Sequence, residues 1–79
     1  MGGVVKSGNL VHDTACLAVE NTRQAAVAGV ASSPSGQVTM NNAEITYHRG
    51  IIASCKANNS SVGLEASVSA LKALGTGGV

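Results

Sequence analysis

The amino-acid sequence predicts an all-α fold of three helices, in which a long first helix is followed by an antiparallel helical hairpin. Two observations point to the hairpin: apolar residues recur at helical spacing in both of its halves, and residues that begin and end helices flank each half. A third observation is the long segment before the hairpin, which is rich in Ala and Val and carries few charges. The chain therefore reads as one helical domain.

The length of 79 residues suits a single domain, and we divide the chain accordingly. Residues 1–8 are expected to be a flexible N-terminal arm because they carry two early glycines and show no helical pattern. Residues 9–75 are expected to form the helical domain. Residues 76–79 have no periodicity and are expected to be a flexible tail.

The first helix is expected within residues 7–31, with Ser7 or Asn9 as its N-cap. Its polar residues fall on a narrow strip, and nearly all others are apolar or small. A helix with so wide an apolar surface is normally buried on more than one side. The two hairpin helices would cover only part of it, so the remainder predicts a subunit interface. The polar strip consists of Asp13, Glu20, Asn21 and Gln24.

The segment after the first helix is expected to be a loop over residues 32–36, which hold the only proline. Residues 37–40 then either form a short strand or lead directly into the next helix. One alternative pairs residues 37–40 with 44–48 as a β-hairpin about Asn41-Asn42, since both stretches contain β-favouring side chains. The helical pattern of the later stretch is cleaner, and we favour the helix.

The first half of the hairpin is expected to begin at Asn41, because Asn41 and Glu44 have the spacing of a capping box. Asn58-Asn59 suits the left-handed exit from a helix. The helical wheel places one set of side chains on a buried half, namely Ile45, Tyr47, His48, Ile51, Ile52 and Cys55. It places another set on the opposite half, namely Thr46, Arg49, Gly50, Ala53 and Lys56.

The second half of the hairpin is expected to begin at Ser60 or Ser61 as its N-cap. Its apolar stripe runs through Leu64, Val68, Leu71 and Leu74. Gly75 stands just after the last leucine, where a glycine commonly ends a helix.

The composition limits how stable this domain can be alone. There is no Phe and no Trp, and Tyr47 is the only aromatic residue, whereas aromatic side chains supply much of the buried area in most cores. A small aliphatic core gives a lone 79-residue chain little margin, so we expect help from self-association or from a larger assembly. A net charge of +1 with 11% charged residues gives too weak a field to expect nucleic acid or an anionic membrane as partner. No stretch approaches the roughly 18 apolar residues of a membrane span, and we identify no signal peptide.

Two histidines and two cysteines raise the question of a zinc site. His12 and Cys16 stand one helical turn apart, but His48 and Cys55 are separated by roughly 10 Å of helix, too far for one ion. We therefore expect no metal and no cofactor. The cysteines are interpreted as small buried hydrophobic residues, and His48 as a hydrogen-bonded core or interface residue. A Cys16–Cys55 disulfide would suit packed helices, but a cytosolic setting disfavours it.

The sequence also contains partial matches to catalytic and nucleic-acid-binding patterns. His12-Asp13 lies near several serines, but neighbouring residues on a helix point in different directions, so we interpret the pair as solvent-facing. The hairpin has the outline of a helix-turn-helix, yet its cations are scattered and residues 62–65 offer no base-reading side chains. We expect a protein that is not an enzyme and does not bind nucleic acid.

Several segments carry a resemblance: Ile45-Thr46-Tyr47-His48, Ile51-Ile52-Ala53, Lys56-Ala57-Asn58-Asn59 and residues 70–78. They resemble small uncharacterised proteins encoded among the structural genes of tailed phages. The resemblance covers about the last half of the chain and includes no catalytic signature. It implies a small virion protein bound to a capsid or tail lattice.

These observations predict a non-enzymatic structural protein that packs against copies of itself and against a larger assembly such as a capsid or tail. Its expected location is the virion, and the alternative is a small cytoplasmic helical adaptor or regulator that binds another protein. The residues expected at the interface are Val19, Ala26, Val27, Val30, Tyr47 and Ile51.

Overall fold

The computed structural model describes residues 7–76 and confirms the all-α prediction. Three helices follow one another along the chain: α1 (Leu10–Val27), α2 (Pro34–Ala57) and α3 (Leu64–Ala73). Residues 7–76 contain no β-strand, so the possible strand at residues 37–40 and the alternative β-hairpin are both wrong. Residues 1–6 of the predicted arm and 77–79 of the predicted tail lie outside the described residues.

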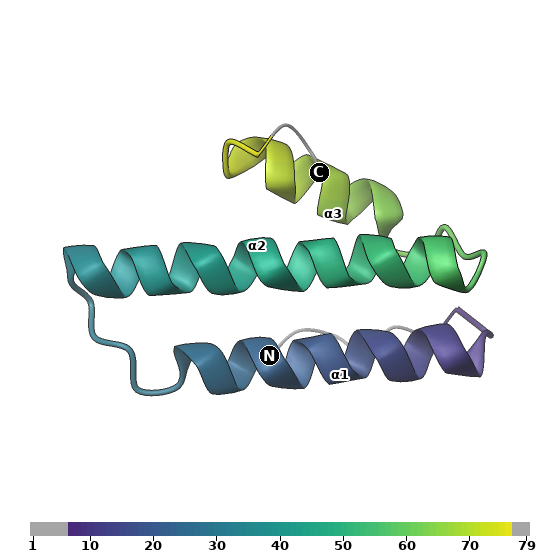
Figure 1. Ribbon diagram of the computed structural model, residues 1–79, viewed down its shortest axis with the longest axis horizontal. Helices are drawn as coiled ribbons and strands as arrows, with labels where there is room; N and C mark the ends of the chain where they lie inside the picture. The colour runs from purple at the N-terminus through teal and green to yellow at the C-terminus, as the bar shows by residue number, and fades with distance from the viewer. Residues whose placement is uncertain (1–6, 77–79) are drawn as a thin grey trace.

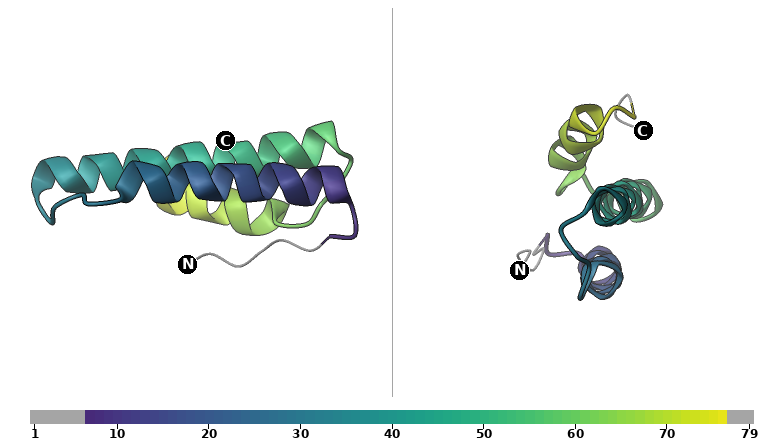
Figure 2. Two further views of the ribbon diagram at one scale, coloured as in Figure 1. Left: turned by 90° about the horizontal axis from the view of Figure 1, so that it is seen from below. Right: turned by 90° about the vertical axis from the view of Figure 1, so that its left-hand side faces the viewer.

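The three helices form one flat layer rather than a closed bundle. Helix α2 lies in the middle, with α1 along one side and α3 along the other (Figures 1 and 2). Both outer helices pack against α2, and no Cα atom of α1 lies within 8 Å of one in α3. The radius of gyration is 12.7 Å, compared with about 11.6 Å for an average compact domain of this length. Within residues 7–76, each outer helix therefore packs against a single helical neighbour.

Helix α1 begins where one of the two predicted caps places it. The Asn9 side chain accepts a hydrogen bond from the His12 N–H at 3.2 Å, so Asn9 is the N-cap. Ser7 instead donates its hydroxyl and its backbone N–H to the Asp13 carboxylate, at 2.7 and 2.9 Å. The helix ends at Val27, four residues before the predicted limit of 31.

Helix α2 begins at Pro34, seven residues before the predicted start at Asn41. Ser33 is the N-cap and accepts from the Gly36 N–H at 3.0 Å, and Pro34 occupies a first-turn position where its missing N–H costs nothing. The proposed capping box is therefore wrong. Asn41 lies inside the helix and accepts from the Gln37 side chain at 2.9 Å, and Glu44 forms ion pairs instead.

The turn between α2 and α3 was predicted correctly at one end only. Asn59 adopts a left-handed φ of 52°, and Ser60 N–H donates to the Cys55 carbonyl at 2.9 Å, so the asparagine pair does end α2. Helix α3, however, is not capped by Ser60 or Ser61. Its N-cap is Gly63, which has a left-handed φ of 87° that favours glycine. No side chain at this position accepts a hydrogen bond from the first turn of the helix. The serine positions were plausible caps, but the chain makes an extra turn before the helix starts.

Helix α3 ends as predicted. Gly75 has a φ of 86°, its N–H donates to the Lys72 carbonyl, and the Thr76 N–H donates to the Leu71 carbonyl, both at 3.0 Å. This pair of hydrogen bonds satisfies carbonyls that would otherwise be left unpaired at the helix end.

The core is small, as the composition predicts. Leu71 is fully buried, and a cluster of Cys16, Ile51 and Cys55 packs with Val19, Tyr47 and Leu64 around α2. Gly50, which was expected on the outer half of α2, instead faces α1: a Cβ atom there would lie 2.7 Å from Cγ1 of Val19. The absence of a side chain thus brings α1 and α2 close together.

Candidate functional site

Helix α1 is turned so that two of its polar residues, His12 and Glu20, face inward. His12 is fully buried and Glu20 is 5% exposed, whereas Leu10 and Leu17 are 79% and 45% exposed. This reverses the usual arrangement of a surface helix. The solvent-facing interpretation of His12 is therefore wrong, and the predicted polar strip does not define the outer side of α1.

The His12 ring joins three parts of the chain. Nε2 lies 3.0 Å from the Val62 carbonyl oxygen in the turn before α3, and Nδ1 lies 2.7 Å from the Ser54 hydroxyl on α2. A neutral ring with its proton on Nε2 satisfies both contacts, because Nε2–H donates to the carbonyl and Nδ1 accepts from the hydroxyl. Asn58 donates to Ser54 Oγ at 3.1 Å, and the Asn9 side chain donates to the Asn58 carbonyl at 3.1 Å. These contacts tie α1, α2 and the following turn together.

The Ser54–His12 contact has the length of a nucleophile–base hydrogen bond, but its surroundings do not suit nucleophilic catalysis. Ser54 is 7% exposed and His12 is fully buried, so a substrate has no approach to the hydroxyl. The second ring nitrogen is bonded to a main-chain carbonyl rather than to a carboxylate. We interpret this network as structural.

Both cysteines are free thiols inside this network, and their burial agrees with the prediction. Cys16 and Cys55 are 2% and 3% exposed. Burial raises the pKa of both thiols above the ordinary value, and the neighbouring Cys55 raises the pKa of Cys16 further. The two thiols therefore ionise at a lower pH in the unfolded chain than in the folded protein. Folding stability is expected to be retained at neutral pH and lost as the pH rises through the ordinary thiol range.

We predict that neither thiol reacts with a chromogenic disulfide reagent at pH 8 while the protein is folded. The thiolate is the reactive species, and burial disfavours it. In guanidinium chloride, both thiols should become reactive together. The fraction of thiols that reacts should equal the unfolded fraction measured by circular dichroism. Rapid labelling of one cysteine in the native protein would contradict this arrangement.

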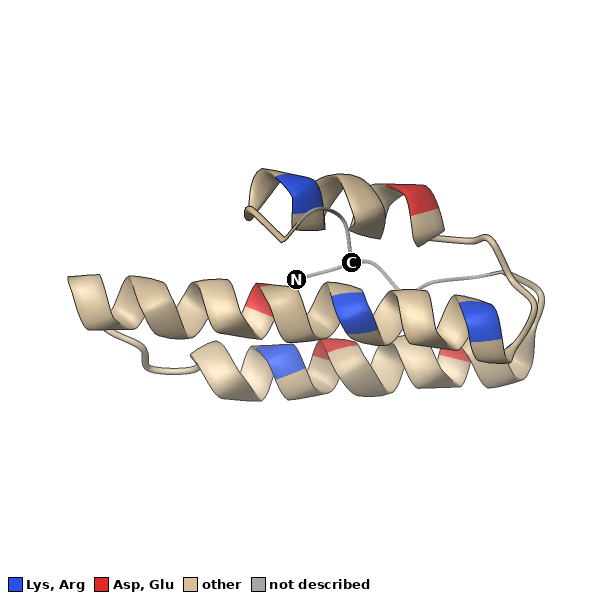
Figure 3. Cartoon of the chain, turned by 45° about the horizontal axis from the view of Figure 1, so that its top comes forward, with Lys and Arg blue, Asp and Glu red and all other residues tan. Residues whose placement is uncertain are grey.

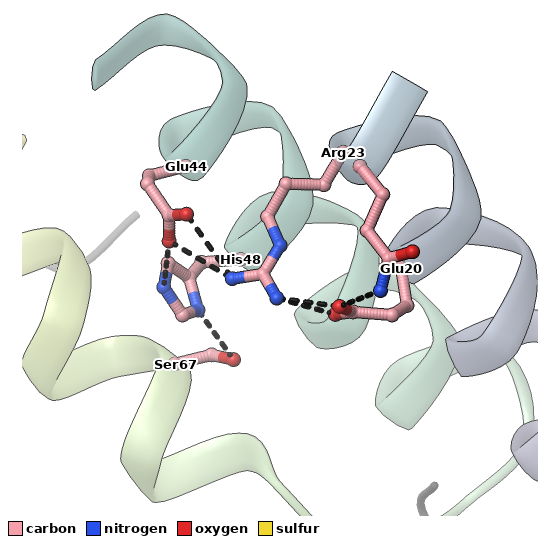
Figure 4. Close-up of polar contacts among 6 residues, drawn as sticks. Glu20, Arg23, Glu44, His48 and Ser67 are labelled. Carbon is pink, nitrogen blue, oxygen red and sulfur yellow. Dashed lines mark hydrogen bonds and ion pairs between the residues drawn. The ribbon is translucent and has the colours of Figure 1, made fainter. Parts of the chain in front are cut away.

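A chain of ion pairs and hydrogen bonds crosses the layer from α1 to α3 (Figure 4). The Arg23 guanidinium bonds both oxygens of Glu20 at 2.5 and 2.8 Å, and its other terminal nitrogen bonds Glu44 at 3.1 Å. The His48 ring lies 3.4 Å from Glu44 through Nε2 and 3.1 Å from the Ser67 hydroxyl through Nδ1. The expectation that His48 is hydrogen-bonded is confirmed. Charged groups join α1 to α2, and the His48–Ser67 hydrogen bond joins α2 to α3. Because the Arg23 ion pairs are partly buried, removing one partner of such a pair is costly.

Tyr47 lies against the same chain. The Arg23 guanidinium carbon is 4.3 Å from the centre of the Tyr47 ring, and the His48 ring meets it edge-on with centroids 4.9 Å apart. Burial and the nearby Glu20 carboxylate raise the pKa of the Tyr47 phenol, with burial the larger cause. The only aromatic residue therefore holds the guanidinium in place from one side.

A groove of ≈ 380 Å³ lies beside Tyr47, between α1 and α2. Its threonine and asparagine side chains and Ala26 are exposed, whereas Val19 and Tyr47 are partly buried and Ala43 is buried. The only charged residue at the groove is Arg23, which is already paired with two carboxylates. The lining residues are Val19, Thr22, Arg23, Ala26, Thr39, Asn42, Ala43, Thr46 and Tyr47.

The residues predicted at an interface separate into three groups. Val19, Ala26 and Tyr47 come together at this groove. Val27 and Val30 are half-buried where α1 ends and the connection to α2 begins. Ile51 is 3% exposed and packs in the core, so it offers no surface to a partner in this structure.

A second surface, the outer face of α1, was not among the predicted interface residues. It consists of exposed side chains on the side away from α2 and carries no charge. Leu10, Thr14, Leu17 and Asn21 follow one another at spacings of four and three residues, the arrangement by which helices pair side by side. We define this outer α1 face by Leu10, Val11, Thr14, Leu17, Ala18, Asn21 and Ala25.

The sequence contained a signal for this orientation. His12, Cys16 and Glu20 are spaced four residues apart and therefore lie on one side of a helix. A buried cysteine in that row indicates that the histidine and the glutamate are buried with it. The partners that make their burial tolerable, Ser54 and Arg23, become evident only in the folded chain.

The charges on the three helices do not form a run of one sign (Figure 3). Among the described residues, no three His, Cys, Asp or Glu side chains lie close enough to hold a metal ion. None of the helices is both long and apolar enough to cross a membrane. Comparison of the chain with protein-family models, with curated proteins and with solved structures found no match.

Proposed function

We propose that this protein is a non-enzymatic structural component that acts by packing against copies of itself within a larger protein assembly, such as the capsid or tail of a virion. The observation that carries the proposal is the orientation of α1. The His12, Glu20 and Arg23 side chains make their polar contacts inside the chain. On the other side of α1, Leu10, Val11 and Leu17 are 79%, 65% and 45% exposed.

The open architecture supports the same proposal. Since α1 contacts α2 but not α3, a further helical neighbour can be added beside α1 without displacing either of the other two described helices. Burying apolar surface contributes about 25 cal/mol per Å², so a helix face of this kind can stabilise an association without any chemistry.

The lack of charge on the outer α1 face favours another copy of the chain as partner. A face without charge can approach another copy of the chain without electrostatic repulsion. The small residues Ala18 and Ala25 on this face allow close approach of a neighbouring helix.

We predict that the wild-type protein sediments as an oligomer at concentrations of tens of micromolar and that Leu17→Glu sediments as a monomer. A carboxylate in the middle of the outer α1 face would have to be buried unpaired on association, which costs several kcal/mol. The matched control is Ala66→Glu, which adds the same charge to an exposed position of α3.

Sedimentation velocity and native mass spectrometry measure the outcome, and circular dichroism checks that both variants remain helical. If the wild-type protein is a monomer up to millimolar concentration, or if both variants dissociate it equally, the outer α1 face does not hold copies of the chain together.

A further inference from the structure

The groove between α1 and α2 does not favour an ionic ligand, because the charged groups beside it are already paired with one another. The terminal nitrogens of Arg23 bond Glu20 on one side and Glu44 on the other. Two carboxylates therefore surround one guanidinium, and nothing is left over to attract an anion. One face of the Tyr47 ring is covered by the same guanidinium, which weakens its attraction for a cationic ligand.

What remains available is an uncharged surface with an apolar floor. Val19, Ala26 and Ala43 lie along the groove with the Tyr47 ring, and the exposed rim carries hydroxyl and amide groups. Grooves of this kind between two helices receive apolar side chains that project from one face of a third helix. An occupant should therefore be a helix with leucines or valines on an uncharged side.

The chain itself carries such a helix face. Leu10 and Leu17 are exposed and stand seven residues apart, so they project from the same side of α1 at a separation of roughly 10 Å. We propose that the groove receives the Leu17 side of the outer α1 face from a second copy of this chain. This inference rests on the proposed self-association and specifies which surfaces meet.

The placement of the two surfaces determines the kind of assembly. Leu17 and Ala26 are nine residues apart, which at about 100° per residue puts them on opposite sides of α1. One copy thus presents its leucine face on one side and its groove on the other. Such a contact joins unlike surfaces and repeats from copy to copy, giving a closed ring or an extended filament rather than an isolated twofold dimer.

Two variants test this arrangement, one for each surface. Leu17→Glu damages the leucine face and leaves the groove intact, whereas Thr46→Glu places a carboxylate at the groove rim and leaves the leucine face intact. Both positions are exposed, and the Ala66→Glu variant again serves as control. Each variant is studied alone and in an equimolar mixture by sedimentation velocity and native mass spectrometry.

We expect each variant alone to be monomeric and the mixture to form a one-to-one dimer that does not grow with concentration. In the mixture, one pair of intact surfaces remains, and the other pair brings two carboxylates together. In a second experiment, the Leu17→Cys and Thr46→Cys variants are mixed and oxidised mildly. We expect a disulfide-linked dimer that contains one copy of each variant.

Other outcomes overturn the inference in distinguishable ways. If Leu17→Glu is monomeric while Thr46→Glu assembles like the wild type, copies associate through α1 alone and the groove is not used. If both variants are monomeric and their mixture stays monomeric, with no mixed disulfide, the two surfaces do not meet. If the wild-type protein never associates, the proposed function fails together with this inference.

Discussion

Replacing His12 with alanine is expected to lower the free energy of unfolding by about 3 kcal/mol. The ring is fully buried and bridges Ser54 and the Val62 carbonyl, so its removal leaves a cavity and weakens the contact between α1 and the turn before α3. A domain of this size has a total stability of only about 4–12 kcal/mol, so the loss is a large part of it.

The measurement is urea unfolding followed by circular dichroism, carried out in the Leu17→Glu background so that association does not contribute. Val11→Ala is the matched control, since Val11 is the neighbouring residue and is 65% exposed. It should change stability by less than about 0.5 kcal/mol. Equal losses for the two variants would mean that His12 does not occupy the buried position described.

Replacing Gly36 with alanine is expected to have an effect of similar size, although glycine-to-alanine changes in helices usually stabilise by about 1 kcal/mol. A Cβ atom at this buried position would lie 1.9 Å from the Ala31 carbonyl oxygen and 3.1 Å from Cγ1 of Val30. An ordinary carbon–oxygen contact is about 3.3 Å, so the first turn of α2 and the preceding connection must separate. We expect a loss of about 3 kcal/mol.

The displacement would also disturb the start of α2, because the Gly36 N–H donates to the Ser33 cap. Urea unfolding in the Leu17→Glu background measures the loss in the free energy of unfolding. Ser35→Ala, at an exposed position of the same turn, is the control for introducing alanine into the first turn of α2. A stabilised Gly36→Ala variant would show that the connection between α1 and α2 does not pack against this glycine.

These two positions illustrate how far the sequence could be interpreted. The row of His12, Cys16 and Glu20 is present in the sequence. His12 was nevertheless interpreted together with Asp13 as a solvent-facing polar pair. In the fold, the two adjacent residues point in different directions: His12 is buried, and Asp13 bonds Ser7 at the start of α1. Gly36 was assigned to a loop, although Ser33-Pro34 carries the features of a helix start.

The sequence by itself determined the helical class, the exit at Asn59 and the end of α3 at Gly75, and it narrowed the first N-cap to Ser7 or Asn9. These features depend on hydrogen bonds and backbone angles within a few neighbouring residues, so local patterns identify them. The tertiary structure decided which side of α1 is buried and which remains open. That choice depends on Ser54, Arg23 and Glu44, partners from 3 to more than 40 residues away in the sequence, which make it less costly to bury a histidine and a glutamate than their side chains alone suggest.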